Sequence, residues 1–111
     1  MDTIAKDLLL NTLAYDIYGG LLTKKQKEIY CMYFFEDFSL AEIGQQFGIS
    51  RQAVNFSIKQ SQKSLAAYEE ELGLIKRHEK ASLCFKDLQA AFDGQNYNEC
   101  SKLLLALSEV I

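Results

Sequence analysis

The stretch SLAEIGQQFGISRQAVNFSIKQSQK, from Ser39 to Lys63, decides the fold because it carries two helix starts on either side of a glycine turn. Ser39 stands three residues before Glu42, the spacing of a capping box that satisfies free backbone N–H groups in the first turn of a helix. Gly48 can adopt the left-handed conformation that ends a helix, and Ser50 supplies a second N-cap. The stretch therefore predicts a helix-turn-helix.

Apolar residues in this stretch recur at helical spacing, so each of the two helices should bury one face. The expected inward positions are Leu40, Ile43 and Phe47 in the first helix and Val54, Ile58, Ser61 and Leu65 in the second. Gly44 has no Cβ and allows the helices to cross closely, while Ile49 can fill the space between them. Such a unit can present its second helix to the major groove of DNA.

The rest of the chain favours an all-α fold without a β-wing, organised as a single domain over residues 1–111. The sequence has no proline and 49% hydrophobic residues, so nothing forces a break and a substantial core is available. We expect an N-terminal helix at 3–18, capped by Asp2 or Thr3 and ended by Gly19-Gly20. A further helix should follow Thr23 and carry core aromatic residues. The second helix of the motif should run to Gly73.

The C-terminal part, at about residues 76–110, predicts a helical hairpin with a turn at 93–96. Its apolar positions are Ala81, Cys84, Phe85, Leu88, Ala91 and Phe92 in the first helix and Tyr97, Cys100, Leu103, Leu104 and Leu107 in the second. This seam could complete the core, form a homodimer interface, or make a groove for a partner helix.

Twelve basic and fifteen acidic side chains give a net charge of −3, whereas DNA-binding domains usually carry a basic face. The charge is uneven along the chain. Residues 23–63 hold six basic and four acidic side chains, a net charge of +2, and the remainder holds six basic and eleven acidic ones, a net charge of −5. Any binding to DNA should therefore be salt-sensitive and fairly weak.

Location is predicted from hydropathy and cysteine use. No apolar run is long enough to cross a bilayer, and the N-terminal MDTIAKDLLL carries acids where a signal peptide would carry lysines. We therefore expect a cytoplasmic protein with no membrane insertion. Cys31, Cys84 and Cys100 are odd in number, widely spaced and on apolar helix faces, which indicates buried free thiols.

The outward side of the second motif helix holds the candidate DNA contacts. With Val54 taken as inward and 100° per residue, five side chains point away from the core. They are Gln52, Asn55, Phe56, Lys59 and Lys63, with Ser50 and Arg51 at the helix start. Amide side chains suit adenine, arginine suits guanine or a phosphate, and lysines would contact phosphates. An ordinary solvated helix face would show the same polar pattern.

Two further features can each be interpreted in two ways. Phe56 could contact thymine methyl groups or belong to a protein–protein contact. Lys24, Lys25 and Lys27 lie in the first turn of their helix, where cations oppose the helix dipole. A DNA phosphate nearby would account for them, and so would a solvated lysine face.

Enzyme chemistry has no support in the sequence. His78 is the single histidine, and it lies in the charged run KRHEK rather than in a recognisable site motif. The glycine-rich phosphate loop, the dinucleotide-binding fingerprint and the HExxH zinc motif are absent. We expect a non-enzymatic protein with no cofactor and no metal.

The run LTKKQKEIYCMYFFEDFSLAEIGQQFGISRQAV lies within residues 22–65, which resemble the promoter-recognising C-terminal region of bacterial sigma factors. Nearly the whole chain resembles the YlxM-like helix-turn-helix proteins of Gram-positive bacteria. Members of that family are typically encoded beside signal-recognition-particle genes, and the resemblance implies a regulatory role in that pathway.

Two functions are therefore expected. The first is a DNA-binding regulator, acting as a homodimer, that inserts the helix from Ser50 to Lys63 into the major groove of duplex DNA. In such a dimer the two helices would lie about one turn of DNA apart, roughly 34 Å. The second is an accessory protein that binds signal-recognition-particle protein or RNA and uses the helix-turn-helix only as a scaffold.

Overall fold

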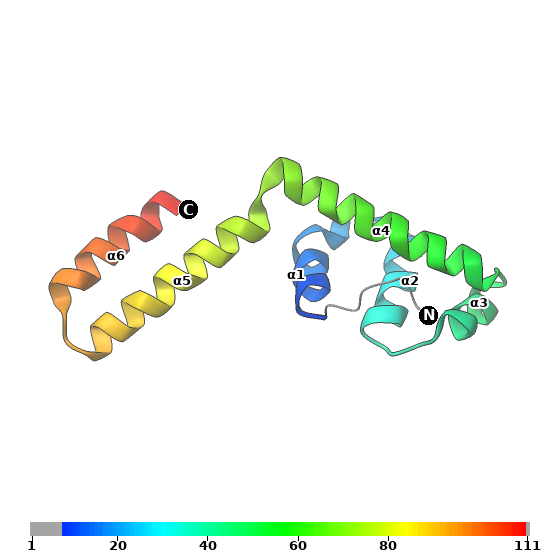
Figure 1. Ribbon diagram of the computed structural model, residues 1–111, viewed down its shortest axis with the longest axis horizontal. Coiled ribbons are helices and arrows are strands. Elements are labelled where there is room, and N and C mark those ends of the chain that lie inside the picture. Colours follow the sequence, from blue (N-terminus) through cyan, green and yellow to red (C-terminus); the bar gives the residue numbers. More distant parts are fainter. Residues whose placement is uncertain (1–7, 111) are drawn as a thin grey trace. The chain divides into compact units, whose positions relative to one another are not determined.

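The computed structural model describes residues 8–110, and within them every regular element is a helix (Figure 1). The elements are α1 (Leu8–Tyr18), the 3₁₀ helix η1 (Gly19–Leu21), α2 (Lys24–Phe34), α3 (Leu40–Phe47), α4 (Arg51–Leu72), α5 (Leu74–Asp93) and α6 (Tyr97–Val110). The predicted all-α fold, with a helix-turn-helix and a C-terminal hairpin, is confirmed. The predicted helix start at residue 3, with its cap at Asp2 or Thr3, lies outside the described residues.

Contacts divide the chain into two compact units, Met1–Leu72 and Gly73–Ile111. Gly73 follows α4 with a φ of 62°, the left-handed conformation that glycine adopts without steric cost. The first unit contains the helix-turn-helix formed by α3 and α4, and the second contains α5 and α6. That the two units form a single domain stays a prediction.

Local side chains begin and end the helices of the first unit as their residue types predict. Thr23 caps α2 in a capping box with Gln26, and Ser39 caps α3 in a second box with Glu42. In the latter, the Ser39 backbone N–H donates to Glu42 Oε1 at 3.0 Å and the Glu42 backbone N–H donates to Ser39 Oγ at 3.1 Å. Gly48 then ends α3 with a φ of 67°. The predicted caps therefore set the boundaries of the motif.

Helix α4 is the element around which the first unit is built. It contacts α1, α2 and α3, and Figure 1 shows it running along one side of all three. Its predicted inward face is confirmed, because its buried residues are Val54, Ile58, Ser61 and Leu65. On α3, Ile43 is fully buried, whereas Leu40 and Phe47 are half-buried.

The crossing of α3 and α4 depends on Gly44. A Cβ at this position would lie 2.7 Å from the backbone carbonyl oxygen of Ile49, closer than real Cβ contacts come. Gly44 therefore allows a close approach between α3 and the turn that leads into α4. Ile49 itself is half-buried in the turn between them.

The aromatic residues of α2 form much of the core, as predicted. Tyr30, Tyr33 and Phe34 are buried, and the Tyr30 ring stacks on that of Tyr15 with centroids 5.3 Å apart. Phe35 differs, because it follows the last residue of α2 and remains 40% exposed. The aromatic cluster therefore packs α2 onto α1 with one ring partly in solvent.

A polar network links three helices inside this core. The Tyr30 hydroxyl lies 3.1 Å from both the backbone oxygen and the side-chain Oδ1 of Asn11, and Gln62 Nε2 donates to the same Oδ1 at 3.4 Å. Burial raises the pKa of Tyr30, so its hydroxyl stays protonated and can donate. The network ties α1, α2 and α4 together. Nothing in the local pattern of the sequence identified it.

The second unit is the predicted hairpin, and its first helix begins two residues earlier than expected, at Leu74. Asn96 Oδ1 caps α6 by accepting the backbone N–H of Glu99 at 3.2 Å. Among the described residues of this unit, only Ile75 and Cys100 are buried. The predicted apolar seam is narrower than expected, because four of its members are exposed. These are Phe85, Phe92, Tyr97 and Leu104.

Cys31, Cys84 and Cys100 are free thiols, but only Cys100 is buried, so the expectation of three buried thiols is corrected. Cys31 and Cys84 are partly exposed. Within residues 8–110, no helix is long and apolar enough to span a membrane.

Candidate nucleic-acid interface

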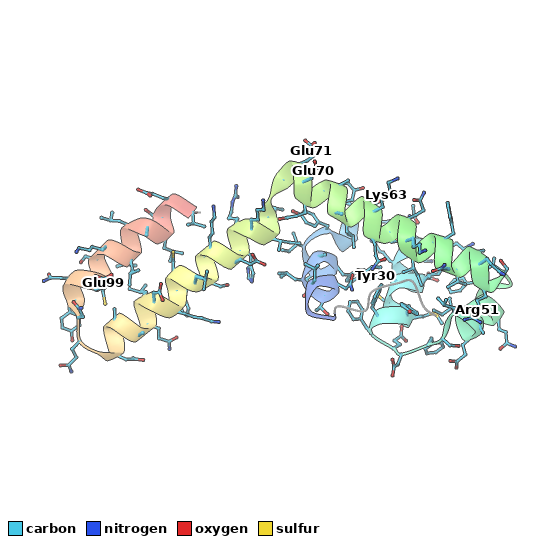
Figure 2. All side chains as sticks on the ribbon, in the orientation of Figure 1. Tyr30, Arg51, Lys63, Glu70, Glu71 and Glu99 are labelled. Carbon is cyan, nitrogen blue, oxygen red and sulfur yellow. The ribbon has the colours of Figure 1, made fainter. Side chains whose placement is uncertain are left out.

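The turn between α3 and α4 sets the position of the first residues of α4. Ser50 Oγ accepts a hydrogen bond from the backbone N–H of Ala53 at 3.0 Å, which is an N-cap. Because the Ser50 oxygen accepts the capping hydrogen bond, the Ser50 hydroxyl can still donate its hydrogen to a phosphate. Arg51 is the first residue of α4 and is exposed at this end of the helix (Figure 2).

Four predicted residues form one exposed row on α4. Gln52, Phe56, Lys59 and Lys63 follow one another at intervals of four, three and four residues, so they share the side opposite Val54 and Ile58. All four are exposed, and Phe56 in the row's middle is 66% exposed. We name this row the α4 outer stripe; Figure 2 labels Lys63 at its far end.

Asn55 differs from its predicted outward position. It is half-buried, and its Oδ1 is buried without a hydrogen-bond partner in the described part of the chain. The reason is geometric, since Asn55 is one residue from Val54 and so lies on the shoulder of the helix. With its oxygen covered, Asn55 cannot offer the two-pronged amide contact to adenine. Gln52 keeps that capacity because its side chain is exposed.

Arg51 lines a shallow groove of about 410 Å³ beside the loop between α2 and α3. The other lining residues include Tyr33, Asp37 and Ser39. The Asp37 carboxylate lowers the positive potential on that side of Arg51. A phosphate would therefore bind the Arg51 guanidinium more favourably from the solvent side than from the groove.

The three lysines of α2 are not all equivalent. Lys24 and Lys25 are exposed in its first turn, whereas Lys27 is half-buried. Lys27 lines a separate groove of about 560 Å³ with residues of α1, α2 and α3. In that groove a hydrogen bond with Cys31 raises the pKa of Tyr15 to about 12. Lys27 and Arg51 therefore line different grooves.

The basic residues of α4 all lie between Arg51 and Lys63. Glu70 continues the row of the outer stripe seven residues after Lys63, and Glu70 and Glu71 are exposed near the end of the helix (Figure 2). Glu69 is engaged otherwise, since its Oε1 accepts the Tyr18 hydroxyl at 2.6 Å. A nucleic acid bound along the stripe would therefore meet repulsion beyond Lys63.

One exposed polar residue next to the stripe was not predicted. Gln60 lies four residues after Phe56 and is exposed. The same count of 100° per residue that selected the stripe would have found it. His78 is exposed on α5, and residues 8–110 contain no group of three His, Cys, Asp or Glu side chains that could hold a metal ion.

Comparison with known proteins points to one family. The UPF0122 family model, described as "Putative helix-turn-helix protein, YlxM / p13 like", matches residues 4–104. A UPF0122 protein of Halalkalibacterium halodurans is 42% identical over 104 residues, which are 94% of this chain and 92% of the relative. One from Symbiobacterium thermophilum is 39% identical over 102 residues, covering 92% and 95% of the two chains.

Higher identity occurs over a shorter stretch. A UPF0122 protein of a Thermoanaerobacter strain is 51% identical over 74 residues, or 67% of this chain. The aligned part spans 63% of that relative's own length.

Proposed function

The chain belongs to the UPF0122 family of YlxM/p13-like helix-turn-helix proteins, and on that premise we propose that it is a non-enzymatic, DNA-binding regulator. The observation that carries the proposal is the α4 outer stripe. It begins directly after a capped turn and offers amide, aromatic and cationic side chains to solvent. In this proposal, the first half of α4 enters the major groove of duplex DNA.

Each exposed residue has a role suited to its chemistry. Gln52 bonds the edge of adenine, and Phe56 contacts thymine methyl groups. Lys59 and Lys63 bind phosphates and set the register of the helix, while Arg51 binds guanine or a phosphate at the helix start. Lys24 and Lys25 are available for flanking phosphates because they are exposed.

Few cations take part, so affinity for DNA should be modest. Counting the cations of α4 alone, three phosphate contacts from Arg51, Lys59 and Lys63 predict that log K falls with log salt concentration with a slope of about −2.7 per chain. Contacts from Lys24 and Lys25 would each make the slope steeper by about 0.9. A homodimer would double this slope and would bind two half-sites about 34 Å apart. We also propose that the protein acts in the cytoplasm.

The signal-recognition-particle role is the second candidate, and the net charge of −3 favours it, because that charge suits a basic protein partner better than nucleic acid. In that case the stripe would be an ordinary solvated face. Binding to particle components would then be insensitive to substitutions of Arg51 and Lys59.

The test is fluorescence anisotropy with a labelled, mixed-sequence duplex at several salt concentrations. The double variant Arg51→Ala/Lys59→Ala removes two proposed phosphate contacts and should lower the salt slope by about 1.8 per chain. The matched control is Lys80→Ala/Lys86→Ala, which removes the same charge from exposed positions on α5. Loss of affinity in the first variant alone supports the proposal. Equal loss in both, or no binding by the wild type, would overturn it.

A further inference from the structure

The hairpin of α5 and α6 carries an apolar surface that the proposed DNA contact does not use. Phe85 and Phe92 are seven residues apart on α5, and so are Tyr97 and Leu104 on α6, so each pair lies on nearly the same side of its helix. The rings of Phe92 and Tyr97 have centroids 6.3 Å apart, which joins the two rows. We name these four residues the hairpin apolar face.

All four residues of this face are more than half exposed. The exposed fractions are 58% for Phe85, 62% for Phe92, 61% for Tyr97 and 54% for Leu104. Units below about 40 residues seldom bury enough surface to fold without disulfides, metals or association. The cysteines are free, and the described residues offer no metal cluster. Burying this face against a further apolar surface would therefore stabilise the unit.

Three charged side chains of the hairpin lie away from this face. Lys76, Lys80 and Glu109 line a shared groove, and Lys76 is nine residues from Phe85, which is half a turn around α5. The hairpin apolar face has no charged member, so two copies of it can meet without like-charge repulsion. A highly charged partner, such as a nucleic acid, would find no counter-charge on it.

We infer that the hairpin apolar face binds the same face of a second copy of the chain, forming a four-helix bundle. Seven-residue spacing of large apolar side chains is typical of helices that pack along a bundle seam. A two-fold dimer uses one self-complementary patch on both chains, and an uncharged face of aromatic and aliphatic residues meets that condition.

The area is sufficient for a dimer. A large side chain carries roughly 150–250 Å² of surface, so four that are more than half exposed provide about 500 Å² per chain. Two copies would bury about 1,000 Å², the lower bound for a specific interface, before neighbouring atoms of the same face are added.

This dimer rests on the proposed function in one respect only: if the protein binds DNA, the dimer would set the spacing of the two α4 helices on it. Its own test needs no DNA. A dimer without DNA binding would overturn the proposed function alone, and a DNA-binding monomer would overturn this inference alone.

The test is sedimentation equilibrium of the full chain, whose mass is 12.6 kDa. The wild type should sediment with twice that mass, and Phe85→Glu/Leu104→Glu should sediment as a single chain, because facing carboxylates would repel. The matched control is Leu83→Glu/Leu105→Glu, at residues 62% and 68% exposed on other sides of the helices. This control should remain a dimer.

A mixture separates repulsion from unfolding. Phe85→Lys/Leu104→Lys should also be a single chain, and an equimolar mixture with the glutamate variant should regain the dimer mass because opposite charges then face each other. A wild type with the mass of one chain would overturn the inference. A dimer that survives the face substitutions, or a mixture that stays monomeric, would also overturn it.

Discussion

The crossing of α3 and α4 gives the sharpest prediction about stability. In Gly44→Ala, the added Cβ would meet the backbone oxygen of Ile49 at 2.7 Å. A backbone oxygen cannot rotate away as a side chain would, so the backbone of the turn that leads into α4 must shift. Helix propensity alone would make Gly44→Ala more stable, so a loss of stability in this variant would report the tight contact with the turn.

Two opposed effects determine the size of the change. Alanine is favoured over glycine inside a helix by about 1 kcal/mol. Overpacking a tight contact costs about 1–3 kcal/mol, and the contact to Ile49 lies at the tight end because it is with backbone. We expect a net loss of about 1–2 kcal/mol in the free energy of unfolding. For a unit of this size, the midpoint temperature falls by about 4–8 °C per kcal/mol.

Urea unfolding followed by tyrosine near-UV circular dichroism provides the assay, since five of the six tyrosines lie in the first unit. The control is Gly20→Ala, where an added Cβ has no neighbour within 4 Å and φ is not positive. The control should be at least as stable as the wild type, because alanine also reduces the freedom of the unfolded chain. A Gly44→Ala protein as stable as this control would refute the reasoning.

Three more predictions concern single hydrogen bonds in the first unit, all measured by urea unfolding. Ser50→Ala removes the cap on Ala53 and should cost about 1 kcal/mol. Tyr30→Phe removes the hydroxyl that donates to Asn11, although the bond from Gln62 remains, and should cost about 1–2 kcal/mol; no change would contradict the network. The Ser39 backbone N–H holds the pKa of Glu42 below its ordinary value of 4.5, so its capping contribution is complete above that pH and disappears as pH falls through the lower folded pKa. Glu42→Gln should remove this part of the acid dependence.

Local rules explain what the sequence predicted well. The caps at Ser39 and Ser50, the left-handed Gly48 and the inward row from Val54 to Leu65 each depend on residues within a few positions of one another. Side-chain type and helical spacing are sufficient for such features. The α4 outer stripe follows from the same spacing, as the side opposite that row.

The features that sequence reasoning missed depend on neighbours distant in the chain. Asn55 has a polar side chain on a helix shoulder, and only the packed structure reveals that its Oδ1 is covered. The Tyr30–Asn11–Gln62 network joins residues up to 51 positions apart. In the hairpin, Phe85 and Leu104 have the spacing of core residues, but a two-helix unit has too little surface opposite them to bury them.

The central claim is that the first half of α4 contacts DNA through its outer stripe. The most direct measurement is a map of backbone amide chemical-shift changes in the full chain during titration with duplex DNA. The largest changes should fall on residues 50–63, fade before Glu70, and weaken as salt is added. Changes that cluster on the hairpin instead, or none at DNA concentrations that saturate other helix-turn-helix proteins, would contradict it.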